Sequence, residues 1–326
     1  MNKKFYFLLA ALCCATMLRA AQYNDLKTIQ SGGVERQYFL YVPDNLKPNS
    51  PLFISCHGMN QDYLYQKTVM KWLPLAADTA SYVAVFPVGE AVSGSWGNMS
   101  SGWDMDGMKD VNFMLDIIDA VKADYNIDDT RVYMSGFSLG GAFAYYMAQK
   151  APDRVAAVVS FSGYDILGGS VSCSRPMPIF HLHGDADEVM QYSGVGYGGI
   201  EDYLQRWSRL FSCANSPEVQ TDYPLAYGST GWGTIMTYKN CQCDVEVKLL
   251  KAPGIQHDWS CLKTGANEAR AIIAFCKQYN TSCGKISPEA IENIVAESAA
   301  TKRIDDGVLL IEKNGKTYTL QGQEVK

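Results

Sequence analysis

The sequence lacks the features that mark several large classes of protein. Beyond its first twenty residues it has no apolar run of about 20 residues, so a membrane-spanning helix is not expected. It carries 28 Lys and Arg against 34 Asp and Glu, and no basic stripe, which argues against a nucleic-acid surface. Internal repeats and low-complexity stretches are not evident. Because 47% of the 326 residues are hydrophobic, the chain can fill a sizeable core, and global disorder is excluded.

The first twenty residues have the pattern of a secretory signal peptide. Two lysines precede an apolar run over residues 5–18, and small residues follow around Ala20. We expect cleavage after Ala20 and a product that is secreted or periplasmic. A membrane anchor would need a longer apolar run, and a lipoprotein signal would need a small residue where Leu12 precedes Cys13.

Cysteines are frequent for an exported chain of this kind. Eight remain beyond the signal segment, and this even number predicts disulfides. A zinc site is the alternative, but a single residue separates Cys241 from Cys243 and no second cluster matches them, so no metal is expected. Cys276 and Cys283 are close enough in sequence to close a small loop. The eight are Cys56, Cys173, Cys213, Cys241, Cys243, Cys261, Cys276 and Cys283.

Between residues 36 and 277, apolar strand-like runs alternate with helical patterns. This alternation predicts an α/β fold with a mostly parallel sheet covered by helices on both faces. Nearly continuous apolar runs, such as residues 51–57, are typical of central strands buried on both sides. Strands are expected at residues 36–43, 51–57, 82–87, 131–135, 155–161, 178–183 and 245–250, and helices at 110–124, 140–150, 200–210 and 267–278.

The alternation stops after Cys283, which divides the chain into a main domain over residues 21–283 and an appended segment over residues 284–326. Two β-prone runs, residues 308–312 and 317–320, flank an Asn-Gly pair. Both residues of such a turn adopt positive φ, which makes Asn-Gly a strong hairpin signal. The appended segment is therefore expected to be a linker followed by a small β-hairpin.

The sharpest motif is Gly-Phe-Ser-Leu-Gly-Gly at residues 136–141, between a predicted strand and a predicted helix. This context is that of a nucleophile elbow, in which Ser138 sits on a strained strand-to-helix turn with its hydroxyl exposed. The helix N-terminus favours negative charge developing beside it. An ordinary glycine-rich turn is the alternative reading.

A nucleophilic serine needs a base, and the chain has only four histidines. His257 follows the last predicted strand, in a loop of the kind that carries function in parallel sheets. His57 ends a strand before Gly58, which suits a loop whose backbone binds an oxyanion. His181 and His183 lie in a predicted strand, where core or supporting roles are expected.

The third member should be an acid between the serine and the histidine in the chain. Three carboxylates follow the strand at residues 178–183, namely Asp185, Asp187 and Glu188. Asp187 lies further from the strand end than Asp185, where the loop can cross toward the histidine loop. Asp187 is therefore the predicted partner of His257.

Four motifs in this order resemble those of the secreted α/β-hydrolases of carbohydrate esterase family one. They are His-Gly at 57–58, the serine motif at 136–141, His-Gly-Asp-Ala-Asp at 183–187, and Gly-Ile-Gln-His-Asp-Trp at 254–259. The family includes feruloyl esterases, acetylxylan esterases and polyhydroxybutyrate-depolymerase-like esterases. Leu139, Ile255-Gln256 and Ser260 depart from the pattern of many relatives, which argues against the depolymerase subgroup. The resemblance also implies that Cys213 pairs with Cys241 or Cys243.

The resemblance and the residues imply the same acyl-transfer mechanism. Ser138 attacks the ester carbonyl, His257 relays the proton, and Asp187 orients His257. Backbone N–H groups of Leu139 and Met59 are expected to bind the oxyanion, and no metal or organic cofactor is required.

Trp96, Trp103 and Trp259 are the candidate substrate-binding residues, because their rings could stack on a sugar or aryl group. Packing of a long loop is the alternative for the first two. A glycine- and aromatic-rich insertion over residues 223–232 is a further candidate, as a roof over the cleft or as a packed loop.

The sequence thus predicts a secreted serine esterase that releases feruloyl or acetyl groups from plant cell-wall polysaccharide. Its partner would be the acylated polymer or its oligosaccharides, with neither nucleic acid nor integral membrane association. A polyhydroxybutyrate-depolymerase-like esterase is the alternative. A serine peptidase is disfavoured because no propeller or large cap domain is present. An inactive glycan-binding module is disfavoured because it would not need Ser138, Asp187 and His257 together.

Overall fold

The structure is a computed structural model, and parts of the chain are described in it. The described residues are 25–44, 46–68, 82–165, 167–194, 198–225, 231–259 and 267–286, together with backbone strands within 301–325. The predicted signal peptide, residues 1–20, and Cys261 lie outside the described residues.

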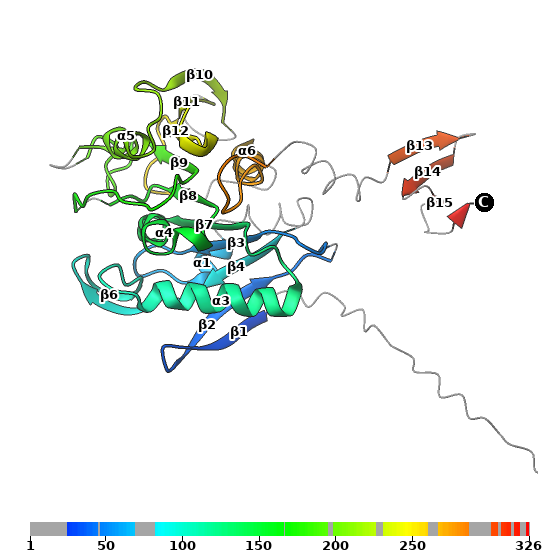
Figure 1. Ribbon diagram of the computed structural model, residues 1–326, viewed down its shortest axis with the longest axis horizontal. Coiled ribbons are helices and arrows are strands. Elements are labelled where there is room, and N and C mark those ends of the chain that lie inside the picture. The colour runs from blue at the N-terminus through cyan, green and yellow to red at the C-terminus, as the bar shows by residue number, and fades with distance from the viewer. Residues whose placement is uncertain are drawn as a thin grey trace, which may run out of the picture.

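A ten-stranded sheet forms the centre of the main domain (Figure 1). Its order is β1-β2-β4-β3-β7-β8-β9-β12-β11-β10, and the six strands from β4 to β12 run parallel. Antiparallel pairs complete both edges. The strands are β1 (Asp25–Ser31), β2 (Val34–Tyr41), β3 (Leu52–Cys56), β4 (Val83–Pro87), β7 (Val132–Phe137), β8 (Ala157–Phe161), β9 (Ile179–Gly184), β10 (Glu218–Pro224), β11 (Trp232–Tyr238) and β12 (Val247–Ala252).

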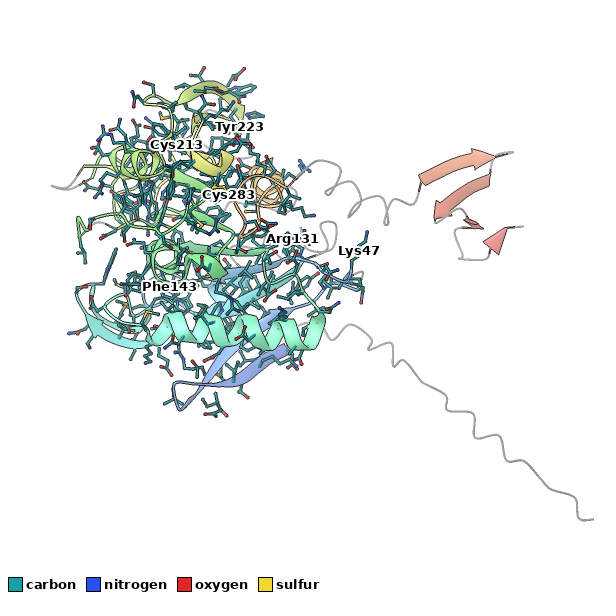
Figure 2. The ribbon with its side chains drawn as sticks, viewed as in Figure 1. Lys47, Arg131, Phe143, Cys213, Tyr223 and Cys283 are labelled. Carbon is teal, nitrogen blue, oxygen red and sulfur yellow. A yellow bond between two sulfur atoms is a disulfide. The ribbon has the colours of Figure 1, made fainter. Side chains whose placement is uncertain are left out.

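Helices pack against this sheet, with α1 on β3 and β4, α4 on β3, β7 and β8, and α5 on β12. Every residue of β3, β4, β7, β8 and β9 is buried, as expected of strands covered on both faces. Figure 2 shows side chains filling the space between the layers. The helices are α1 (Tyr63–Thr68), α3 (Lys109–Tyr125), α4 (Leu139–Lys150), α5 (Ile200–Leu210) and α6 (Asn267–Cys276), with 3-10 turns at Pro152–Arg154 and Gln242–Asp244.

The predicted α/β-hydrolase architecture is confirmed, and the predicted central strands and helices are present. Five strands of the main domain were not expected. They are β1 at one edge of the large sheet, β11 and β10 at the other, and β5 (Glu90–Gly94) and β6 (Gly97–Gly102), which form a separate hairpin. Among the described residues, no helix is long and apolar enough to span a bilayer.

The appended segment contains the predicted hairpin. Strands β14 (Val308–Lys313) and β15 (Lys316–Thr319) pair antiparallel, with Lys313 opposite Lys316. Strands β13 (Thr301–Asp305) and β16 (Glu324–Val325) extend it to four strands, which the sequence did not indicate.

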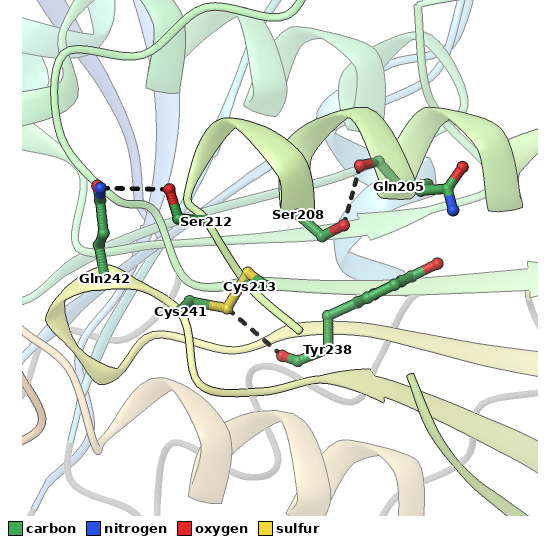
Figure 3. The surroundings of a disulfide bond; sticks show 7 residues. All are labelled: Gln205, Ser208, Ser212, Cys213, Tyr238, Cys241 and Gln242. Atoms are coloured by element: carbon green, nitrogen blue, oxygen red, sulfur yellow. Dashed lines mark hydrogen bonds between the residues drawn. A yellow bond between two sulfur atoms is a disulfide. The ribbon is translucent and has the colours of Figure 1, made fainter. Parts of the chain in front are cut away.

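Two disulfides lie at the β12 side of the domain. Cys213 bonds Cys241, joining the end of α5 to the segment before β12 (Figure 3), and this is one of the two pairings that the resemblance implied. Cys243 bonds Cys283, so the small loop that Cys276 and Cys283 are close enough in sequence to close does not form. The reason is the direction of the side chain: Cys276 lies on the buried face of α6 with a free thiol and is fully shielded from solvent.

Candidate active site

The candidate site lies where the parallel strands end. Carboxyl ends of parallel strands meet at one edge of a sheet, and ligands bind in the crevice outside that edge. The loops after β3, β7, β9 and β12 carry the predicted functional residues Met59, Ser138, Asp187 and His257. Strand order therefore brings together residues that lie up to about 200 positions apart in the sequence.

Ser138 occupies a strained turn between β7 and α4. Its φ is 54° and its ψ is −121°, a region that costs a non-glycine residue on the order of 1–3 kcal/mol. The turn is held by the Ser138 amide, which donates to Phe161 O at 2.8 Å. Glycine is required nearby, because a Cβ on Gly140 would collide with the backbone of Cys56 and His57. The elbow predicted from the motif is thus formed by close backbone packing.

Two hydrogen bonds connect Ser138, His257 and Asp187. The Ser138 hydroxyl lies 2.8 Å from His257 Nε2, and His257 Nδ1 lies 2.8 Å from Asp187 Oδ2. A carboxylate only accepts, so Nδ1 carries the proton and Nε2 is left to accept from the serine. Ser138 and His257 are partly exposed, whereas the Asp187 side chain is fully buried. The structure thus brings the three predicted residues together in the predicted order.

The Asp187 carboxylate is fixed from several directions. The amides of Val189 and Met190 donate to Oδ1 at 3.0 and 2.8 Å. Burial alone would raise the pKa of Asp187, but hydrogen bonds from His257, Ser162 and the Met190 amide outweigh it and hold the pKa below its usual value. Asp187 is therefore ionised at neutral pH.

Among the described residues, the carboxylates of Asp185 and Glu188, on the same loop as Asp187, form no hydrogen bond with His257. Asp185 accepts a hydrogen bond from the Gly254 amide at 2.7 Å and lies 3.8 Å from Lys251 Nζ. It thereby ties together the loops that carry Asp187 and His257, without reaching the imidazole. Glu188 is exposed.

The loop after β3 lies against the nucleophile. A Cβ on Gly58 would lie 3.2 Å from Ser138 Cβ, so the loop passes close to the serine one residue before Met59. Buried His57 braces this loop: Nδ1–H donates to Gly58 O at 2.8 Å, and Nε2 accepts from the Gly89 amide at 2.9 Å. Within the described residues, neither the Met59 amide nor the Leu139 amide donates a hydrogen bond. These two N–H groups are the candidate oxyanion donors.

The predicted substrate contacts of Trp103 and Trp259 are wrong, because both indoles are buried, with 0% and 2% exposure. Trp103 instead donates Nε1–H to His57 O at 2.8 Å and supports the loop after β3. Its ring stacks on Phe143 of α4 (labelled in Figure 2). Trp259 donates to Ser162 Oγ at 2.9 Å. Trp96, in the turn between β5 and β6, is half-buried and keeps part of its surface exposed.

Sequence reasoning missed Ser162, which follows β8 at the same edge. Its φ of 48° is unusual for serine, and its hydroxyl lies between Trp259 Nε1 and the Asp187 carboxylate. Its place after a central strand was the available signal. Trp232, at the end of the predicted insertion, is 56% exposed. Residues 226–230 of that insertion lie outside the described residues.

Sequence comparisons agree with the fold. The family described as phospholipase/carboxylesterase matches residues 98–197. The bifunctional acetylxylan esterase/xylanase XynS20E of Neocallimastix patriciarum is 39% identical over 234 residues, covering 72% of this chain and 32% of the relative. Feruloyl esterase B of Piromyces equi is 25% identical over 185 residues, covering 51% of this chain and 33% of the relative. The chain thus spans about one third of the length of these two relatives.

Solved structures give the same fold. The acetyl xylan esterase from Aspergillus awamori superposes with a TM-score of 0.56 at 13% identity, covering 77% of this chain and 98% of that one. A CE1 ferulic acid esterase from Anaeromyces mucronatus superposes with a TM-score of 0.50 at 14% identity, covering 80% and 92%. The chain therefore has the α/β-hydrolase fold, and the relatives that it matches are named as acetylxylan and feruloyl esterases, as the motifs predicted.

Proposed function

We propose that this protein is a serine carboxylic-ester hydrolase that removes acetyl or feruloyl groups from plant cell-wall polysaccharide. The observation that carries the proposal is the continuous hydrogen-bonded path from Ser138 through His257 to Asp187 at the carboxyl edge of the sheet. The same constellation of nucleophile, base and orienting acid performs acyl transfer on unrelated folds.

In the first half of the reaction, Ser138 Oγ attacks the ester carbonyl while its proton passes to His257 Nε2. Asp187 keeps Nδ1 protonated and stabilises the imidazolium that forms. The tetrahedral intermediate collapses as His257 returns the proton to the leaving alkoxide. In the second half, water replaces the alcohol: His257 takes a proton from the water that attacks the acyl-enzyme. It returns this proton to Ser138 Oγ as the second tetrahedral intermediate collapses and the acid leaves.

The oxyanion of each tetrahedral intermediate would be bound by the amides of Leu139 and Met59. Removing one such donor typically costs about 3 kcal/mol of transition-state stabilisation. The Leu139 amide is the first N–H of α4, where the helix dipole adds a favourable field for negative charge. No step in this scheme needs a metal or an organic cofactor.

The substrate class rests on the relatives and on the departures from the depolymerase pattern at Leu139 and Ile255-Gln256. The relatives are named as acetylxylan and feruloyl esterases. Half-buried Trp96 offers an aromatic surface to a sugar or aryl ring. Two disulfides support an extracellular or periplasmic location, since disulfides persist in oxidising compartments, and residues 1–20 are the proposed export signal.

The nucleophile is tested with Ser138→Ala, using Ser172→Ala, an exposed serine away from the site, as the matched control. Ser138→Ala should lose hydrolysis of p-nitrophenyl acetate and labelling by a fluorophosphonate, with an unchanged circular dichroism spectrum. Ser172→Ala should match the parent protein. Substantial activity in Ser138→Ala would remove the proposed mechanism.

The substrate class is tested with a panel of methyl ferulate, acetylated xylan and hydroxybutyrate oligomers. We expect kcat/KM to be greatest for one of the first two. Much faster hydrolysis of hydroxybutyrate oligomers would instead assign the depolymerase-like activity.

The division into a catalytic domain over residues 21–283 and an appended segment over residues 284–326 is also a proposal. Deleting residues 288–326 removes the small sheet and retains Cys283 and its bridge. The truncated protein should keep nearly full activity on p-nitrophenyl acetate. A large loss would show that the appended segment takes part in catalysis or stability.

A further inference from the structure

Behind Asp187 lies a line of buried polar side chains that the mechanism does not use. The Tyr145 hydroxyl lies 3.0 Å from His181 Nδ1, and His181 Nε2 lies 3.0 Å from His183 Nδ1. His183 Nε2 lies 2.6 Å from the carbonyl oxygen of Met190. Tyr145 is 1% exposed, and both histidines are 0% exposed.

The direction of these hydrogen bonds follows from their end point. The Met190 carbonyl only accepts, so His183 Nε2 must carry a proton. A neutral His183 then accepts at Nδ1, which requires the proton on His181 Nε2. By the same reasoning His181 Nδ1 accepts from the Tyr145 hydroxyl. With both rings neutral, each of the four ring nitrogens of His181 and His183 has one hydrogen-bond partner.

Burial keeps the two rings neutral. It lowers the pKa of His183 to about 4, and it lowers the pKa of His181 well below its ordinary value, with the neighbouring ring as a second cause. A proton added to His183 at Nδ1 would face the Nε2–H donor of His181, whereas one added to His181 at Nδ1 would require the Tyr145 hydroxyl to turn and accept. The hydrogen bonds from Tyr145 through His181 and His183 to Met190 therefore all run in one direction at neutral pH.

This series of hydrogen bonds connects the helix that follows the nucleophile to the loop that carries the acid. Tyr145 lies on α4, the helix that begins directly after Ser138. At the other end, Met190 accepts from His183 with its carbonyl oxygen and donates its amide to Asp187 Oδ1 at 2.8 Å. His183 Nε2 also lies 3.5 Å from Asp187 Oδ2. The loop that holds Asp187 is thus anchored to the helix of the nucleophile.

We propose that Tyr145, His181 and His183 are positioning residues that hold the Met190 peptide, and through it the Asp187 carboxylate, in line with His257. This inference rests on the proposed function, since it assigns a support to the acid of that mechanism. Packing alone would not require these buried polar side chains, because apolar side chains fill a core without needing hydrogen-bond partners. In metal sites, removing an outer partner that orients a ligand typically lowers activity by about 10–100-fold, and an orienting partner of a catalytic carboxylate acts in the same way.

The proton arrangement is tested without any activity measurement. Long-range ¹H–¹⁵N spectra of the four histidine rings report which nitrogen carries the proton. His181 and His183 should be neutral with the proton on Nε2 at pH 7, whereas His57 and His257 should carry it on Nδ1. A charged ring, or an Nδ1 proton, at His181 or His183 would overturn the proposed chain.

The positioning role is tested with Tyr145→Phe, which removes one hydroxyl and keeps the ring against Tyr203 and Trp207. The matched control is Tyr146→Phe on the same helix, whose hydroxyl donates to Gly107 O at 2.9 Å, outside the chain. We expect Tyr145→Phe to lower kcat about tenfold, with KM within about twofold. Tyr146→Phe should match the parent protein.

A merely structural role is separated by combining Tyr145→Phe with Asp187→Asn. If the hydroxyl acts through Asp187, its removal costs nothing further once that carboxylate is gone. If the loss of kcat is the same in both backgrounds, or if Tyr145→Phe changes only the melting temperature, the positioning role is overturned. Should the parent protein have no Ser138-dependent activity, the proposed function fails, and the ring spectra still test the chain.

Discussion

The Asp187 carboxylate accepts a hydrogen bond from His257 Nδ1 at 2.8 Å, although 70 residues separate the two. The contact arises because β9 and β12 are parallel neighbours, with Gly184 opposite Ala252. Both loops leave the sheet at the same level, and the Asp185 carboxylate ties them together through the Gly254 amide. Two carboxylates of one loop thus have separable tasks.

This separation predicts different consequences for the two matched substitutions. Asp187→Asn should lower kcat by as much as ~10⁴-fold, because an amide no longer favours the Nδ1–H tautomer of His257. Asp185→Asn should keep kcat within about fivefold, because an amide oxygen can still accept from Gly254. Steady-state kinetics on p-nitrophenyl acetate checks both. If Asp185→Asn were the inactive variant, the acid would have to be reassigned.

A second prediction concerns the buried indole of Trp103, which supports the loop after β3 that carries the proposed oxyanion donor Met59. Trp103→Phe keeps a ring against Phe143 and removes the donor to His57 O, leaving a buried carbonyl unpaired at a cost of about 1–3 kcal/mol. We expect a lower melting temperature and a reduced kcat, with little change in KM, since the loop carries the Met59 amide.

The matched comparison is Trp96→Phe, and with it Trp96→Ala. Trp96 retains exposed surface and lies in the turn of the β5–β6 hairpin. Neither substitution should change kcat on p-nitrophenyl acetate, whereas Trp96→Ala should raise KM on feruloylated or acetylated xylan fragments if the ring stacks on substrate. Equal effects of the Trp103 and Trp96 variants on kcat would contradict the support assigned to Trp103.

Local sequence signals were sufficient to predict the strands and the strand-to-helix turn that position the candidate site. The serine motif predicted the elbow because its glycines are needed at backbone contacts, such as that of Gly140 with Cys56 and His57. The strands around it were predictable because burial on both faces leaves nearly continuous apolar runs. The order serine, acid, histidine, together with the position of Asp187 in its loop, then predicted Asp187 and His257, which the sheet order brings together.

Properties set by the tertiary fold were not predictable in this way. The sequence does not distinguish an exposed tryptophan from a buried one, and Trp103 and Trp259 proved to be buried hydrogen-bond donors. Tyr145 and His181 are 36 residues apart, and only the packing of α4 on the sheet makes them partners. Edge strands such as β10 lack the double burial that produces a clear pattern, since most of its residues are exposed.

A third prediction distinguishes the two possible partners of Cys283. The structure bonds it to Cys243, closing a separation of 40 residues, and leaves Cys276 buried and free. Replacing Cys243 and Cys283 together by serine should lower the free energy of unfolding by about 2–4 kcal/mol. Cys276→Ala should leave the bridge intact, as peptide mapping under non-reducing conditions would show. A peptide that links Cys276 to Cys283 would contradict the structure.

The fourth prediction is a loss of stability in mild acid, caused by the buried histidines. Burial lowers the pKa of His57, His181 and His183, so the unfolded chain binds protons that the folded chain excludes. Stability should therefore fall as the pH drops below about 6.5, the ordinary histidine pKa, down to the folded value of about 4 for His183. His183 alone should account for about 2 kcal/mol between pH 8 and pH 5. Urea titrations across this range check the slope, which should be shallower in His183→Gln. A flat profile between pH 8 and pH 5 would mean that the buried rings titrate alike in the folded and unfolded protein.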